Sequence, residues 1–144
     1  MKRTVPPPAM IAFDAAERNV CVVRRQSTST PLQALALLND TQIVEAARHV
    51  GERMLREGGT NVQAQVTFAF RLVTGRTPTA KEITILQQLL EEQQARFTAD
   101  PADAAKLLAV GETKNSADLP TPDLAAGTVL AQALFSHDEA VMRR

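Results

Sequence analysis

The residues with the greatest chemical capacity in this sequence form one run, RRQSTST, at positions 24–30. It contains two guanidinium groups and four hydroxyl groups, and Pro31 follows as a typical first residue of a helix. A helix N-terminus offers free amides and a partial positive charge, and arginine pairs well with oxyanions, so sulfate, phosphate or carboxylate is favoured there. The predicted anion-binding residues are Arg24, Arg25, Ser27, Thr28, Ser29 and Thr30.

The same run has a structural interpretation. Thr30 is a suitable N-cap, and the two arginines can pair with carboxylates or backbone carbonyls of a neighbouring domain. Ser27 or Ser29 as a nucleophile lacks a local base, so the run predicts no catalytic residue by itself. Both interpretations remain open at the level of the sequence.

The sequence gives less support to other candidate catalytic or metal-binding residues. His49 lies near Glu45 and Glu52 in sequence, but a metal or catalytic role needs partners that the sequence does not place nearby. The acidic residues after His137 are adjacent to it and do not converge on one point of a helix. Cys21, the only cysteine, is flanked by valines and suits a small buried hydrophobe. The sequence therefore predicts no metal site, no internal disulfide and no cofactor in this chain.

Composition narrows the class of protein. The chain has 144 residues, 44% hydrophobic and 22% charged, which fits one globular domain with its own core. The formal net charge is zero, which disfavours nucleic-acid binding because neutralising phosphates needs a basic excess. No apolar run approaches the ~20 residues of a membrane-spanning helix. Pro6–Pro8 interrupt the N-terminal apolar residues, so we expect no signal peptide.

Residues 1–30 and residues 31–144 differ in pattern. Three successive prolines favour an extended arm over residues 4–9, and Val20–Val23 is a β-favouring run that can pair with Met10–Phe13 in one short hairpin. Helix start signals dominate afterwards. They lie at Thr30 with Gln33, Asp40, Thr60 with Gln63, Thr79 with Glu82, Asp100 with Pro101, and Thr121 with Pro122. We predict an all-α fold: an extended arm over 1–30 and a bundle of about five or six helices over 31–144.

Apolar spacing indicates which helix faces pack. Leu32, Leu35 and Leu38 supply the apolar side of the first predicted helix. Residues 112–120 are a polar loop. Gly127 falls inside the last long helix, where glycine costs about 0.5–1 kcal/mol relative to alanine and adds no packing volume.

Several motifs resemble a known family. They are KRTVPPPAM at 2–10, FDA at 13–15, VRRQSTSTPLQALALLND at 23–40, FRLVTGRTPTAKE at 70–82 and LLAVGE at 107–112. Together they resemble the Planctomycetes-type PSD domain family, domain of unknown function 1553. The resemblance implies the C-terminal part of a longer bacterial protein that is exported to the periplasm or cell surface. It also implies a cytochrome c-like domain upstream, which would hold any haem, and it implies no known reaction.

Two functional hypotheses follow. The first is a non-catalytic docking or structural module that packs on the upstream domains of the same polypeptide. The second is an anion-binding or catalytic surface, formed by the run at 24–30 and completed by upstream residues, that acts on anionic polysaccharide. Nucleic acid is not an expected partner in either case.

Overall fold

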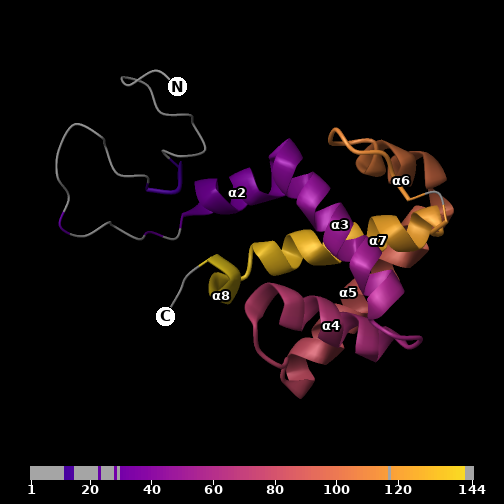
Figure 1. Ribbon diagram of the computed structural model, residues 1–144, viewed down its shortest axis with the longest axis horizontal. Helices are drawn as coiled ribbons and strands as arrows, with labels where there is room; N and C mark the ends of the chain where they lie inside the picture. The colour runs from indigo at the N-terminus through magenta and orange to yellow at the C-terminus, as the bar shows by residue number, and fades with distance from the viewer. Residues whose placement is uncertain (1–11, 15–22, 24–27, 29, 117, 142–144) are drawn as a thin grey trace.

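The computed structural model describes residues 12–14, 23, 28, 30–116 and 118–141 (Figure 1). Within these ranges the chain is helical and has no strand, so the predicted all-α class is confirmed. The helices are α2 (Pro31–Asn39), α3 (Thr41–Glu57), α4 (Val62–Thr74), α5 (Ala80–Ala99), α6 (Pro101–Leu108), α7 (Thr121–Phe135) and α8 (Asp138–Val141). None of these helices is both long enough and apolar enough to cross a lipid bilayer.

Helix α7 is the centre of the bundle. It packs against α3, α5 and α6, and α3 crosses it in the view of Figure 1. Buried residues occur on all of its sides, which is typical of a helix enclosed by others. They are Leu124, Ala125, Ala126, Gly127, Thr128, Leu130, Ala131, Gln132 and Leu134.

Helices α3 and α7 cross at two glycines. A Cβ atom on Gly51 would lie 3.0 Å from the carbonyl carbon of Gly127 and 3.1 Å from the amide nitrogen of Thr128. A Cβ on Gly127 would lie 3.3 Å from the Cα of Gly51. The missing side-chain volume of Gly127 therefore allows the two backbones to approach closely.

Most predicted helix starts are confirmed. Thr30 and Thr79 each form a capping box, and Asp40 caps α3 by accepting a hydrogen bond from the Gln42 amide at 2.9 Å. The predicted start at Thr60 is wrong, because Asn61 is the N-cap of α4 and its side chain accepts from the Ala64 amide at 2.7 Å. Asparagine is the stronger N-cap of the two residue types.

The predicted arm and hairpin fall mostly outside the described residues. Of the proposed strand partners, Ala12 is helical and Phe13 lies in a turn, so the strand prediction is wrong there. The next residue, Asp14, has a positive φ of 52°, which ends an extended run. Residues 4–9 and Val20–Val22 belong to the part that is not described.

Candidate functional site

The predicted anion-binding run is described only at Thr28 and Thr30, while Arg24, Arg25, Ser27 and Ser29 lie outside the described residues. The Thr28 hydroxyl donates to the Asp14 carboxylate at 2.6 Å, and the Thr28 amide donates to the same oxygen at 2.8 Å. The Thr30 hydroxyl accepts from the Gln33 amide at 3.3 Å. Both described hydroxyl groups are therefore engaged by residues of this chain, and the anion-binding role of the run stays a prediction.

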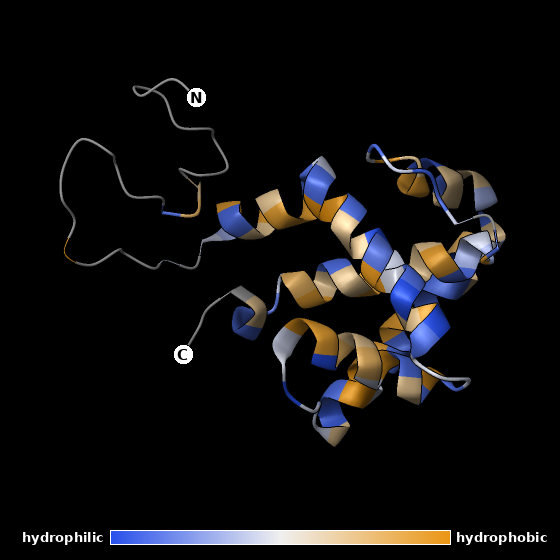
Figure 2. Ribbon diagram, viewed as in Figure 1, coloured by the Kyte–Doolittle hydropathy of each residue, from blue (hydrophilic) through white to orange (hydrophobic). Residues whose placement is uncertain are grey.

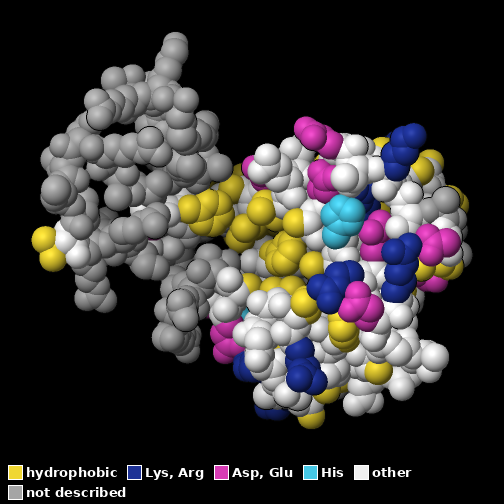
Figure 3. Space-filling model, in the orientation of Figure 1, with side chains coloured by type: hydrophobic (Ala, Val, Ile, Leu, Met, Phe, Trp, Pro, Cys, Tyr) yellow, Lys and Arg dark blue, Asp and Glu magenta, His cyan; other side chains and the backbone are white. Residues whose placement is uncertain are grey.

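The apolar side of α2 faces solvent. Leu32, Leu35 and Leu38 are 61%, 56% and 44% exposed, whereas Gln33 on the same helix is buried. Helix α2 contains no charged residue, and most of it is hydrophobic (Figure 2). Hydrophobic side chains gather over α2 in the space-filling view, while charged side chains lie on the other half of that face (Figure 3). We call the three leucines the α2 leucine face; its existence was predicted, but its exposure was not.

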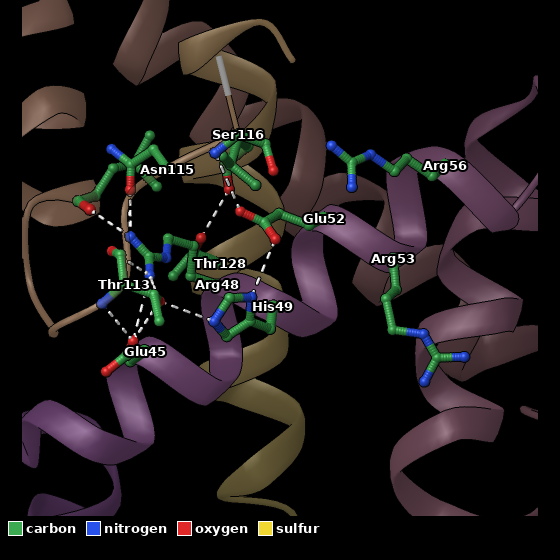
Figure 4. A network of polar contacts seen from close by, with 12 residues as sticks. Glu45, Arg48, His49, Glu52, Arg53, Arg56, Thr113, Asn115, Ser116 and Thr128 are labelled. Atoms are coloured by element: carbon green, nitrogen blue, oxygen red, sulfur yellow. Dashed lines mark hydrogen bonds and ion pairs between the residues drawn. The ribbon is translucent and has the colours of Figure 1, made fainter. Parts of the chain in front are cut away.

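A second functional candidate is a polar network between α3 and the loop that follows α6 (Figure 4). Four side chains lie on one face of α3 and contact residues 108–116. Their sequence spacings of three, one and three residues place them on that common face. We call this set the α3–loop clamp. Its α3 members are Glu45, Arg48, His49 and Glu52.

Arg48 is the buried centre of the α3–loop clamp, with an exposed fraction of 1%. Its Nη1 donates to the carbonyl of Leu108 at 3.0 Å and to the side chain of Asn115. Its Nη2 donates to the Thr113 carbonyl at 2.9 Å and to the Thr113 hydroxyl at 2.6 Å. Since Leu108 is the last residue of α6, Arg48 satisfies a carbonyl that the helix end leaves without a partner.

Glu45 receives donors from the same loop. The amides of Glu112 and Thr113 donate to its two carboxylate oxygens at 3.1 and 2.9 Å, and the Thr113 hydroxyl donates to it as well. These hydrogen bonds, foremost that of the Thr113 hydroxyl, lower the pKa of Glu45 to about 2. The carboxylate is therefore ionised at neutral pH, and it holds the loop against α3.

Glu52, His49 and Thr113 lie in the order carboxylate, imidazole, hydroxyl. Glu52 Oε2 is 3.0 Å from His49 Nδ1, and His49 Nε2 is 3.1 Å from Thr113 Oγ1. This order resembles that of a hydrolase triad. In a triad, however, the hydroxyl donates its proton to the imidazole, whereas the Thr113 hydroxyl donates to Glu45 and accepts from Arg48. The arrangement therefore suits a structural clamp better than acyl transfer.

The pKa of Glu52 also fits a structural role for this residue. Its burial opposes ionisation, but hydrogen bonds from His49 and Ser116 outweigh that effect, so its pKa is lowered. His49 has a half-exposed side chain, 47% by area, and its acidic partner in the described part of the chain is Glu52. Within the described ranges no group of three or more His, Cys, Asp or Glu side chains could hold a metal ion.

Sequence reasoning identified His49 and its two acidic neighbours but not their partners. The spacing of Glu45, Arg48, His49 and Glu52 on one helix face is a local signal that something polar covers this face. The covering segment begins about 60 residues later, and no local pattern specifies that pairing.

Comparison with known proteins gives one match. The model of the family PSD1, described as protein of unknown function (DUF1553), matches residues 1–90. The matched range includes the α2 leucine face and the α3 members of the α3–loop clamp, but it ends before Thr113. No curated protein and no solved structure matches the chain.

Proposed function

Because the chain belongs to the DUF1553 (PSD1) family of proteins of unknown function, we propose that it is a helical docking module within that family. The α2 leucine face carries the proposal. Three leucines on one side of an uncharged helix are about half exposed or more, although the bundle has an enclosed core elsewhere. A contiguous exposed apolar surface is typical of a protein interaction site.

The small size of this face favours a partner in the same polypeptide. Fully burying an exposed leucine side chain contributes roughly 1.5–3 kcal/mol, so covering three half-exposed leucines contributes on the order of 3 kcal/mol. That is too little for a stable complex of separate proteins, whose interfaces usually bury about 800 Å² on each partner. A tethered partner is present at an effective concentration of order mM, where such a weak contact is useful.

The proposed partner is an upstream domain of a longer protein. The family resemblance implies that this neighbour includes a cytochrome c-like domain, that any haem belongs to it, and that the parent is exported to the periplasm or cell surface. Recognition would be apolar, since α2 offers no charged side chain. The alternative, an anion-binding or catalytic surface for anionic polysaccharide at residues 24–30, stays a prediction that no contact of the described residues favours over the first.

A photocrosslinking experiment tests the proposal. A benzophenone amino acid replaces Leu35 in the full-length protein in its native host, and Ile85, which is 66% exposed on α5, is the matched control. We expect position 35, but not position 85, to crosslink to peptides from another domain of the same polypeptide. Crosslinks from position 35 that fall only within residues 1–144, or equal products from both positions, would contradict the proposal.

A further inference from the structure

The loop Gly111–Thr113 presents its donors to a single negative group. Two successive amides, those of Glu112 and Thr113, point at the two oxygens of the Glu45 carboxylate, and the Thr113 hydroxyl points at the same group. Successive amides that converge on one anion form an anion-binding nest. Gly111 precedes the nest with a φ of +108°, and a Cβ atom there would lie 2.7 Å from the Glu45 carboxyl carbon. A side chain at position 111 would therefore collide with the bound carboxylate.

Arg48 adds a buried positive charge behind the nest. Its Nη2 lies 3.6 Å from Glu45 Oε1 and donates to the Thr113 hydroxyl. Its Nε atom is buried and has no hydrogen-bond partner among the residues that the structure describes. Buried polar groups are normally paired, so the guanidinium retains donor capacity at this position. A guanidinium and two amides around one oxyanion are the usual elements of carboxylate and phosphate recognition.

We infer that Gly111–Thr113, together with Arg48, is a carboxylate-binding site that Glu45 occupies as a built-in ligand and that an external carboxylate enters when the Glu45 side chain is absent. The pKa of Glu45, about 2, agrees with a site that strongly prefers the charged form. The inference is independent of the docking proposal, because no residue of α2 belongs to this site.

The built-in ligand explains how the site is kept closed. A tethered group competes at an effective concentration of order mM or higher, so a free carboxylate at similar concentration does not displace Glu45. A natural ligand must therefore bring additional contacts, as a partner protein with an acidic side chain does. In the variant Glu45→Ala this competition is removed and the nest becomes available to a small anion.

The experiment follows the amides of Glu112 and Thr113 by NMR while sodium formate is added to the Glu45→Ala chain. Sodium chloride at equal ionic strength is the reference. We expect saturable shifts of these two amides with formate in the variant and no saturable shift in the wild type. The unfolding midpoint of the variant should rise by about 5 °C when formate exceeds its Kd roughly tenfold.

The matched control is Glu57→Ala, because Glu57 lies on the same helix and, among the described residues, pairs only with Arg53, at 2.9 Å. No saturable shift at Glu112 or Thr113 in Glu45→Ala, or an equal shift in Glu57→Ala, overturns the inference. If inorganic phosphate saturates these amide shifts and formate does not, the assignment of the site to carboxylate ligands is overturned. If Glu45→Ala is unfolded in chloride, recovery of helical circular dichroism in formate supports the site, and failure to recover overturns it.

Discussion

Helix α3 meets two of its neighbours, α7 and α2, in opposite ways. Against α7 its backbone is in close contact through Gly51, where an added methyl group would lie 3.0 Å from a backbone atom of α7. Helix α2, joined to α3 through Asp40, instead leaves three leucines in solvent. The contrast separates a region whose packing is complete within the chain from one whose apolar surface is uncovered. Stability should therefore depend on α3, α7 and the clamped loop, and interaction on α2.

Removing α7 should have the largest effect. In the described part of the chain the buried apolar residues run from Val44 to Leu134, and α7 supplies a large share of them. A chain that ends at Pro120 should lose cooperative thermal unfolding, as measured by circular dichroism. A chain that begins at Thr28 should keep it. A cooperative transition in the chain without α7 would show that the bundle core does not require this helix.

Replacing Arg48 with methionine should cost about 3 kcal/mol, because removing one partner of a buried charged network leaves the others unpaired. The carbonyls of Leu108 and Thr113 would lose their donors. Urea unfolding measures the change. Arg53→Met is the control: Arg53 is half exposed and pairs with Glu57, so its loss should cost under about 1 kcal/mol. Equal effects of the two substitutions would contradict the buried role of Arg48.

Arg48 also illustrates what a sequence leaves undetermined. Capping residues such as Thr30 and Thr79 act on amides three residues away, so they predict helix starts well. The burial of Arg48 depends on a loop that returns more than 60 residues later. An arginine beside two glutamates is normally expected on a solvated face. The predicted polar loop is present, but its attachment to α3 arises only from the tertiary fold.

The leucines and Gly127 show a related limit. Periodicity correctly grouped Leu32, Leu35 and Leu38 on one side of α2, but it carries no information on whether another element covers that side. Gly127 predicts a local cost for its helix, and only the structure shows that this glycine lies where α7 crosses α3 at Gly51. For the candidate site at 24–30, Thr30 was identified as an N-cap from sequence, whereas the Asp14 partner of Thr28 was not.

The two glycines of the crossing should differ in their tolerance of alanine. A methyl on Gly51 meets backbone atoms of α7, which cannot move alone, so Gly51→Ala should cost about 1–2 kcal/mol after the gain in helix propensity. A methyl on Gly127 meets chiefly the terminal methyl of Met54, 3.0 Å away, which can rotate aside. Gly127→Ala should therefore be close to neutral. Urea unfolding measures both variants. A lower urea midpoint for Gly127→Ala than for Gly51→Ala would contradict the close backbone contact at Gly51.

Acid should weaken the α3–loop clamp in a defined range of pH. The pKa of Glu45 is lowered from 4.5 to about 2 in the folded chain, so the unfolded chain binds its proton first as pH falls. The stabilisation by Glu45 is complete above about pH 4.5 and is lost progressively between about pH 4.5 and pH 2. The difference in urea midpoint between wild type and Glu45→Gln should shrink over this range. A constant difference would show that the ionised form is not what stabilises the loop.

The smallest effect is expected on the α2 leucine face. Leu35→Ser should change the free energy of unfolding by no more than about 0.5 kcal/mol, because the side chain is already 56% exposed. Leu130→Ala, at a position with no exposure, should cost about 2–5 kcal/mol. A loss near 2 kcal/mol at Leu35 would mean that the face is already covered within this chain. If Leu35→Ser is near neutral for folding but a benzophenone at Leu32, on the same face, no longer crosslinks to another domain in that variant, docking is separated from folding and the leucine face is assigned to function.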